Sequence, residues 1–219
     1  SLLIPEFSRC AAGHRQPRVR YLARRSLRTA LLYGLAVGSV LFSLARPLGE
    51  LLYHEPDAGT YLRLYAPLVP LLYTDIITDA ICKGLGHQDA NARYNLLTSF
   101  LDVAFLWYLL PRLGLGGYFL SFAVTHLVNF LLSFRRLVLV SGIRMDLSPV
   151  LRAAVCTVAA ALGAELLPQG SGALGLVLSG SCCLLLLLFL WTLLRVIGPE
   201  DFLWLRTIFR QKPAPHPHR

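Results

Sequence analysis

The chain has 219 residues, of which 55% are hydrophobic and 15% charged, whereas an average soluble domain carries about 25% charged residues. Its mean hydropathy is +0.57, and the apolar residues are gathered into long runs. This composition excludes an ordinary water-soluble domain and indicates a membrane protein. The formal net charge of +9 would also suit a nucleic-acid-binding protein, so the positions of the basic residues must separate the two classes.

Six segments are long and apolar enough to cross a bilayer, because a hydrocarbon core of about 30 Å takes about 20 residues of helix. They are Leu27–Ala45, Tyr61–Cys82, Asn95–Leu110, Tyr118–Val140, Leu151–Leu167 and Leu174–Ile197. The sequence therefore predicts an all-α polytopic membrane protein with a six-helix bundle over residues 26–197. The fifth segment is short and rich in alanine, so a re-entrant or interfacial position stays open for it.

Outside this bundle, residues 1–25 are expected to hold the end of a preceding helix and a basic cytoplasmic loop. Within this region, the arginine-rich segment His14–Arg28 also carries apolar residues at helical spacing, which predicts a helix lying on the membrane surface. Residues 198–219 are expected to form a cytoplasmic interfacial helix that starts near Pro199, followed by a disordered tail. The first residue is not Met, and we expect the chain to be a fragment of a longer protein.

Cation-rich and cation-poor connections alternate along the six segments. Six arginines precede the first segment, and the connection after it has one arginine against three acidic residues. The third and fifth connections carry further cations, the fourth has only Arg112, and the sixth is uncharged. Because Lys and Arg gather on the cytoplasmic side, both ends of the chain are predicted to be cytoplasmic. We attribute the basic excess to topology and to contact with anionic lipids, and we expect no nucleic-acid partner.

Two aspartates and a lysine in the second segment are candidate coupling or gating residues. Asp75 and Asp79 are four residues apart, so they share one face of a helix, and Lys83 follows by the same interval. Ionisable groups inside a membrane are costly and often mark transport paths. The alternative is a structural ion pair at the helix end. Pro67 and Pro70 are predicted to break or kink this segment on the N-terminal side of the aspartates.

Further polar groups lie in the third and fourth segments. Asp102 has no partner at helical spacing, so another helix, water or protonation must satisfy it. His126 is a candidate proton-responsive group, although a simple hydrogen bond to a neighbour would also explain it. Beside His126, four polar side chains recur at intervals of four and form a seam that either bonds to neighbouring helices or lines a wet cavity: Ser121, Thr125, Asn129 and Ser133.

The sequence contains no motif for catalysis, metal binding or phosphate binding. Its five cysteines form no C-x-x-C pair and have no histidine at metal-ligand spacing. We therefore expect no enzymatic activity, no metal and no cofactor.

Several short motifs follow one another in a defined order. They are LIPEFS at Leu3–Ser8, ARPLGELLY at Ala45–Tyr53, YLRLYAPLVP at Tyr61–Pro70, KGLGHQ at Lys83–Gln88, NARYN at Asn91–Asn95 and PRLGLGGY at Pro111–Tyr118. In this order they resemble the polysaccharide-biosynthesis branch of the multidrug/oligosaccharidyl-lipid/polysaccharide exporter superfamily, in particular the stage V sporulation protein B family. The resemblance covers about residues 1–145, and beyond them it rests on hydropathy.

The resemblance implies a 14-helix transporter of two bundles, in which this chain supplies the second, MATE-like bundle. It implies a flippase that moves an undecaprenyl-linked oligosaccharide or peptidoglycan precursor across a bacterial cytoplasmic membrane, for spore cortex or cell-wall synthesis. The missing N-terminal half would be its partner and would hold the cationic cavity. A cation-coupled multidrug exporter of the same superfamily and a non-transporting scaffold for cell-wall enzymes are the alternatives.

Overall fold

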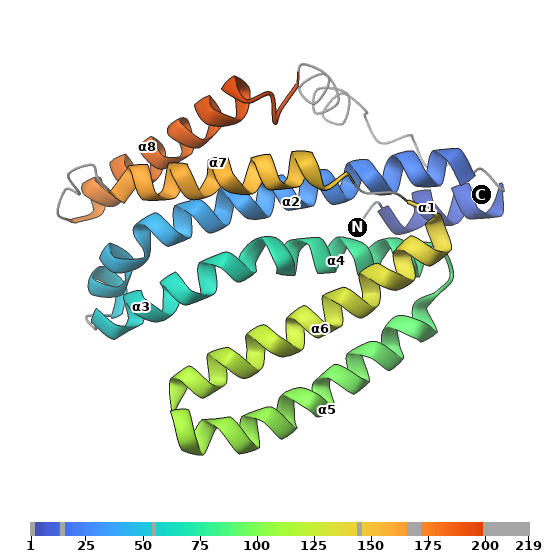
Figure 1. The fold of residues 1–219 in the computed structure, drawn as a ribbon, viewed down its shortest axis with the longest axis horizontal. Helices are drawn as coiled ribbons and strands as arrows, with labels where there is room; N and C mark the ends of the chain where they lie inside the picture. The colour runs from blue at the N-terminus through green and yellow to red at the C-terminus, as the bar shows by residue number, and fades with distance from the viewer. Residues whose placement is uncertain (1–2, 14–15, 54–55, 144–145, 166–171, 199–219) are drawn as a thin grey trace, which may run out of the picture.

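Helices make up every regular element of the computed structural model, which describes residues 3–13, 16–53, 56–143, 146–165 and 172–198 (Figure 1). In chain order the elements are α1 (Leu3–Ala12), α2 (Gln16–Leu48), the π-helical turn η1 (Gly49–Tyr53), α3 (Pro56–Tyr65), the 3-10 turn η2 (Ala66–Leu68), α4 (Val69–Gly84), α5 (Gln88–Leu113), α6 (Leu115–Ser141), α7 (Leu147–Glu165) and α8 (Gly172–Leu193). The expected all-α class is confirmed. The interfacial helix and tail expected at 199–219 lie outside the described residues.

Among the described residues, five helical stretches are long and apolar enough to cross a membrane. They are Gln16–Leu51, Asp57–Gly84, Gln88–Leu113, Leu115–Ser141 and Gly175–Leu193. The fifth predicted segment corresponds to α7, whose apolar part, Ser148–Ala164, is shorter than these five. Most of each predicted segment therefore falls in helix, although the sixth runs past the end of α8 at Leu193 and the end of the fifth lies outside the described residues. The fifth segment, whose position was left open, is also the shortest apolar stretch among them.

The proline break predicted in the second segment is present. α3 ends at Tyr65, the chain makes the 3-10 turn η2, and α4 begins at Val69. Proline lacks the N–H needed for the helical ladder and its ring collides with the preceding turn. α2 approaches the break closely, since a Cβ built on Gly34 would lie 2.5 Å from Cα of Pro70.

The arginine-rich segment does not form the separate surface helix that we expected. α2 runs without interruption from Gln16 to Leu48, so this segment and the first span are one helix. Its apolar residues Val19, Ala23 and Leu27 are buried in a core with side chains from α1, α4, α6 and the residues after α6: Phe7, Cys10, Ile81, Cys82, Leu137 and Ile143. An apolar stripe has the same periodicity whether it faces lipid or packs on other helices, so the sequence could not separate the two. Here the stripe packs on other helices.

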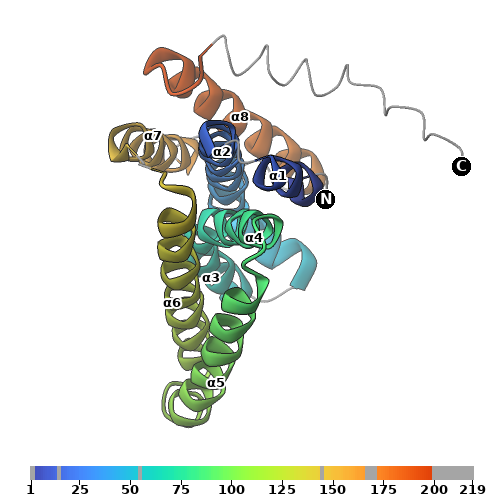
Figure 2. The same ribbon diagram turned by 90° about the vertical axis from the view of Figure 1, so that its right-hand side faces the viewer.

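α2 lies at the centre of the helices. It contacts α3 and α4 on one side and α7 and α8 on the other, and α6 packs on α4 (Figures 1 and 2). α5 is an edge helix that packs mainly on α6. Within this fully described helix the only buried side chains are the polar Asn91 and Thr98. The most deeply buried side chains of α5 are therefore polar.

Candidate functional site

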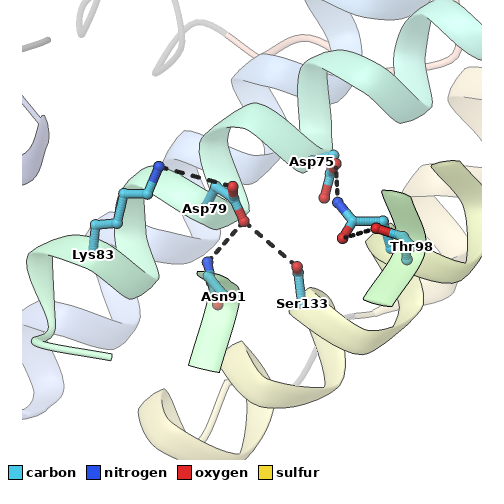
Figure 3. A network of polar contacts seen from close by, with 7 residues as sticks. Asp75, Asp79, Lys83, Asn91, Thr98 and Ser133 are labelled. Carbon is cyan, nitrogen blue, oxygen red and sulfur yellow. Dashed lines mark hydrogen bonds and ion pairs between the residues drawn. The ribbon is translucent and has the colours of Figure 1, made fainter. Parts of the chain in front are cut away.

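Asp79 on α4 lies at the centre of a polar network between three helices (Figure 3). The Nδ2 group of Asn91, which is fully buried on α5, donates a hydrogen bond of 2.7 Å to Oδ1 of Asp79. The Ser133 hydroxyl of α6 donates to the same oxygen over 3.5 Å. On the side of α4 itself, Nζ of Lys83 lies 4.0 Å from Oδ2, which confirms the predicted pair one turn apart. One carboxylate thus joins α4, α5 and α6.

Asp75 lies one turn earlier on α4 and faces the same two helices (Figure 3). Asn129 of α6 donates from Nδ2 to Oδ2 of Asp75 over 2.9 Å. The Thr98 hydroxyl of α5 in turn donates to Oδ1 of Asn129 over 3.4 Å. The other carboxylate oxygen of Asp75 is buried and has no hydrogen-bond partner among the described residues. Oδ2 of Asp75 is therefore hydrogen-bonded, and Oδ1 is left for a proton or a ligand.

Asp102 obtains its partners from a second helix, which is one of the three sources that the sequence left open. The hydroxyls of Ser121 and Thr125 on α6 donate to its Oδ1 over 2.8 and 3.2 Å. All four members of the predicted seam are buried, and each of them hydrogen-bonds to one of the three aspartates. Residues at intervals of four lie on the same face of a helix. On α6 this face hydrogen-bonds to all three aspartates.

A polar cavity of about 170 Å³ opens between α5 and α6 beside this seam. Its lining is Asn95, Thr98, Ser99, Asp102, Thr125, His126 and Asn129. The His126 ring packs on Phe122 with centroids 4.1 Å apart, and its Nδ1 is buried with no hydrogen-bond partner in the described part of the chain. Among the described residues, Nδ1 therefore does not make the hydrogen bond to a neighbour that we considered as the alternative for His126. The seam on α6 both hydrogen-bonds to neighbouring helices and borders a polar cavity, the two possibilities that the sequence left open.

The contribution of α5 was missed in the sequence. Asn91, Asn95 and Thr98 precede Asp102 at intervals of four, three and four, which is one helix face. This stripe has the same spacing as the seam on α6 and could have been found in the same way. It was overlooked because its members are short polar residues that are also common in turns and helix starts.

The site brings titratable carboxylates together with neutral oxygen and amide groups. Carboxylate, amide and hydroxyl oxygens lie along one face of α6 in three hydrogen-bonded groups, and Oδ1 of Asp75 has no hydrogen-bond partner among the described residues. Within the described ranges no group of three or more His, Cys, Asp or Glu residues is arranged to hold a metal ion.

Comparison with known proteins does not add to this description: no family model, no curated protein and no solved structure matches the chain.

Proposed function

We propose that this chain is part of a membrane transporter and that Asp75, Asp79 and Asp102 are its coupling or gating groups. The observation that carries the proposal is the ladder of three carboxylates that accept hydrogen bonds from one polar seam of α6, with a polar cavity that is lined by Asp102. A helix packed only for structure would not need charged groups at membrane depth, where each is expensive. Transporters use such groups to bind coupling ions and to link ion binding to helix movement.

The depth of Asp102 supports a transport role. Asp102 is 14 residues from the start of α5 and 11 from its end, which corresponds to about 21 and 17 Å of helix. It therefore lies near the middle of a segment that is long enough to cross the hydrocarbon core. Its neighbours Asn95 and Ser99 are exposed, and exposed polar groups at this depth call for water or a polar partner rather than lipid.

The arrangement of charges supports the proposed orientation. The start of α2, the turn between α4 and α5 and the end of α6 meet at one end of the molecule (Figure 1). Contacts join these segments: Arg136 lies 3.3 Å from His87, and the Arg20 side chain reaches Gly142. Three cation-rich parts of the chain thus share one end. We place this end, and with it both ends of the chain, on the cytoplasmic side of a bacterial cell membrane.

The substrate class follows from the resemblance described above. We infer that the chain forms the second, MATE-like bundle of a flippase for an undecaprenyl-linked glycan or peptidoglycan precursor, used for spore cortex or cell-wall synthesis. A cation-coupled multidrug exporter is the second candidate, because a carboxylate ladder would serve ion coupling equally well. Accumulation of a cell-wall precursor in a deletion strain favours the flippase, and a drug-sensitivity phenotype without such accumulation favours the exporter.

The role of the carboxylates is tested by replacing Asp75, Asp79 and Asp102 one at a time with Asn in the complete protein. Transport is measured in proteoliposomes with a fluorescent lipid-linked precursor, and protein amount and melting temperature are measured in parallel. Asp89→Asn on the exposed start of α5 is the matched control. We expect slower transport with unchanged protein level for at least one of the three variants. Wild-type transport by all three would reject the proposed role.

A further inference from the structure

Two cavities lie along α2 and α7, and we refer to the pair as the crevice. α7 lies along α2 in the view of Figure 1. The first cavity, of about 180 Å³, is at the basic end of α2 and is lined by Arg24, Arg28, Leu31 and Leu32 of α2, by Asp146, Pro149, Val150 and Ala153 at the start of α7, and by Val196 after α8. Two arginines face one aspartate there, so the lining carries a net positive charge.

A second cavity of about 230 Å³ lies further along the same two helices. Its lining is mainly apolar and includes Leu35, Gly38 and Phe42 of α2, Ala154, Val158 and Ala161 of α7, and Ala66, Pro67 and Pro70 at the break between α3 and α4. The Val158 side chain is 58% exposed, so this part of the crevice can be reached from outside. No charged side chain lines it.

The two cavities follow one another along a single face of each helix. On α2 their lining residues continue at intervals of three or four from Arg28 through Leu31, Leu35 and Gly38 to Phe42. Arg28 and Phe42 are separated by 14 residues, or about 21 Å of helix. One leaflet accounts for about 15 Å of the hydrocarbon core, so the crevice is long enough for one acyl chain.

The change from charged to apolar lining coincides with the start of the hydrocarbon. Between Ala30 and Ala45, α2 contains no Asp, Glu, Lys, Arg or His, so Arg28 lies at the level of the lipid headgroups. Its Nη2 group donates a 2.6 Å hydrogen bond to the carbonyl oxygen of Val196, which holds the guanidinium between α2 and the end of α8. Guanidinium groups bind phosphate strongly, and basic pockets between membrane helices bind anionic headgroups.

We propose that this crevice binds one anionic phospholipid. Its phosphate lies against Arg24 and Arg28, and one acyl chain follows the apolar lining toward Phe42. The lipid would fill the space between α2 and α7 where their side chains leave a gap, and would so fasten α7 to the other helices. This inference rests on the crevice alone and holds whether or not the chain belongs to a transporter.

The proposal is tested by native mass spectrometry of the protein titrated with phosphatidylglycerol, with phosphatidylcholine as the uncharged comparison. The double variant Arg24→Gln/Arg28→Gln removes the cations of the crevice, and Arg9→Gln/Arg135→Gln removes two exposed cations elsewhere. Each arginine near a headgroup is worth roughly fivefold in affinity. We therefore expect about 25-fold weaker phosphatidylglycerol binding for the crevice variant and a much smaller change for the control.

A second variant separates a fitted site from surface charge. Val158→Trp leaves the charge unchanged and places a large ring in the apolar part of the crevice. We expect it to weaken phosphatidylglycerol binding while Arg24 and Arg28 are intact. Equal losses in the crevice and control arginine variants would overturn the proposal, and so would wild-type binding by Val158→Trp, because the lipid would then be held by general surface charge. Melting temperatures confirm that each variant is folded.

Discussion

Replacing Asp79 tests whether hydrogen bonding or charge holds α5 to the other helices. The Asp79→Leu variant removes the acceptor of the 2.7 Å bond from Asn91 and leaves that fully buried amide without its acceptor. It also removes the 3.5 Å contact from Ser133 and the 4.0 Å pair with Lys83. Asp79→Asn keeps an oxygen for Asn91 and loses only the charge.

The expected sizes follow from these contacts. Hydrogen bonds between membrane helices average about 0.6 kcal/mol and reach about 1.7 kcal/mol, and the short, buried bond from Asn91 should lie at the upper end. The contact from Ser133 is at the limit of hydrogen bonding and adds little. The pair with half-exposed Lys83 is worth about 0.3–0.5 kcal/mol. Asp79→Leu should therefore destabilise the protein by about 2 kcal/mol and Asp79→Asn by about 0.5 kcal/mol.

Thermal unfolding of the purified protein in detergent measures these differences. For a chain of this size 1 kcal/mol shifts the melting temperature by about 2–4 °C, so we expect a loss of about 4–8 °C for Asp79→Leu and about 1–2 °C for Asp79→Asn. Asp89→Leu is the control, since Asp89 is exposed in the first turn of α5 and contributes at most about 1 kcal/mol through the helix dipole.

The double variant Asp79→Leu/Asn91→Leu gives the sharpest result. Removing both partners of a buried hydrogen bond is often nearly neutral, whereas removing one leaves a buried polar group unpaired. The other amide atom of Asn91, Oδ1, is already buried without a partner among the described residues. We expect the double variant to be more stable than Asp79→Leu. If its destabilisation equals the sum of the two single changes, the hydrogen bond is not what couples these helices.

Three further predictions concern packing, the cysteines and topology. Gly34→Ala should lower the melting temperature by several degrees, because its Cβ would lie 2.5 Å from Cα of Pro70 and such crowding costs about 1–3 kcal/mol; Gly116→Ala, with no atom within 4 Å of its Cβ, should not lower it. In the folded protein in detergent, an apolar maleimide should modify Cys182 first, since the other four free cysteines are buried, and mass spectrometry of peptides would show equal labelling of all five if the packing is wrong. A cysteine introduced by Asp57→Cys in intact cells should react with a membrane-impermeant reagent, and reaction only after permeabilisation would contradict the proposed orientation.

Several features of the site could be predicted from spacing alone. The pair of Asp79 and Lys83 follows from their separation by one helical turn. Asp102 needed another helix, water or protonation to satisfy it because its own helix offers no partner, and the structure shows that α6 supplies one. The break between α3 and α4 follows from the covalent structure of proline. All three depend on one residue and its local chain, which is why the sequence suffices.

The partners of individual side chains could not be predicted. The seam on α6 was visible, but its hydrogen bonds to Asp75 and Asp79 depend on how α4 and α6 are placed against each other. Asn91 and Thr98 joined the site only because α5 turns its polar face inward and its large apolar residues outward, among them Phe100 and Trp107. In water the opposite orientation would be expected, whereas in a membrane lipid satisfies the apolar face.

The sequence by itself determined that this is a chain of apolar helices, where those helices lie and which of their residues are too polar for lipid. These properties follow from hydropathy and helical periodicity, which every helix carries locally. Only the tertiary structure decided that the arginine-rich start of α2 packs against protein, and that three aspartates from two helices join one seam on a third. Periodicity specifies the face of a helix that must be covered, but the covering group is chosen by packing between segments distant in the chain.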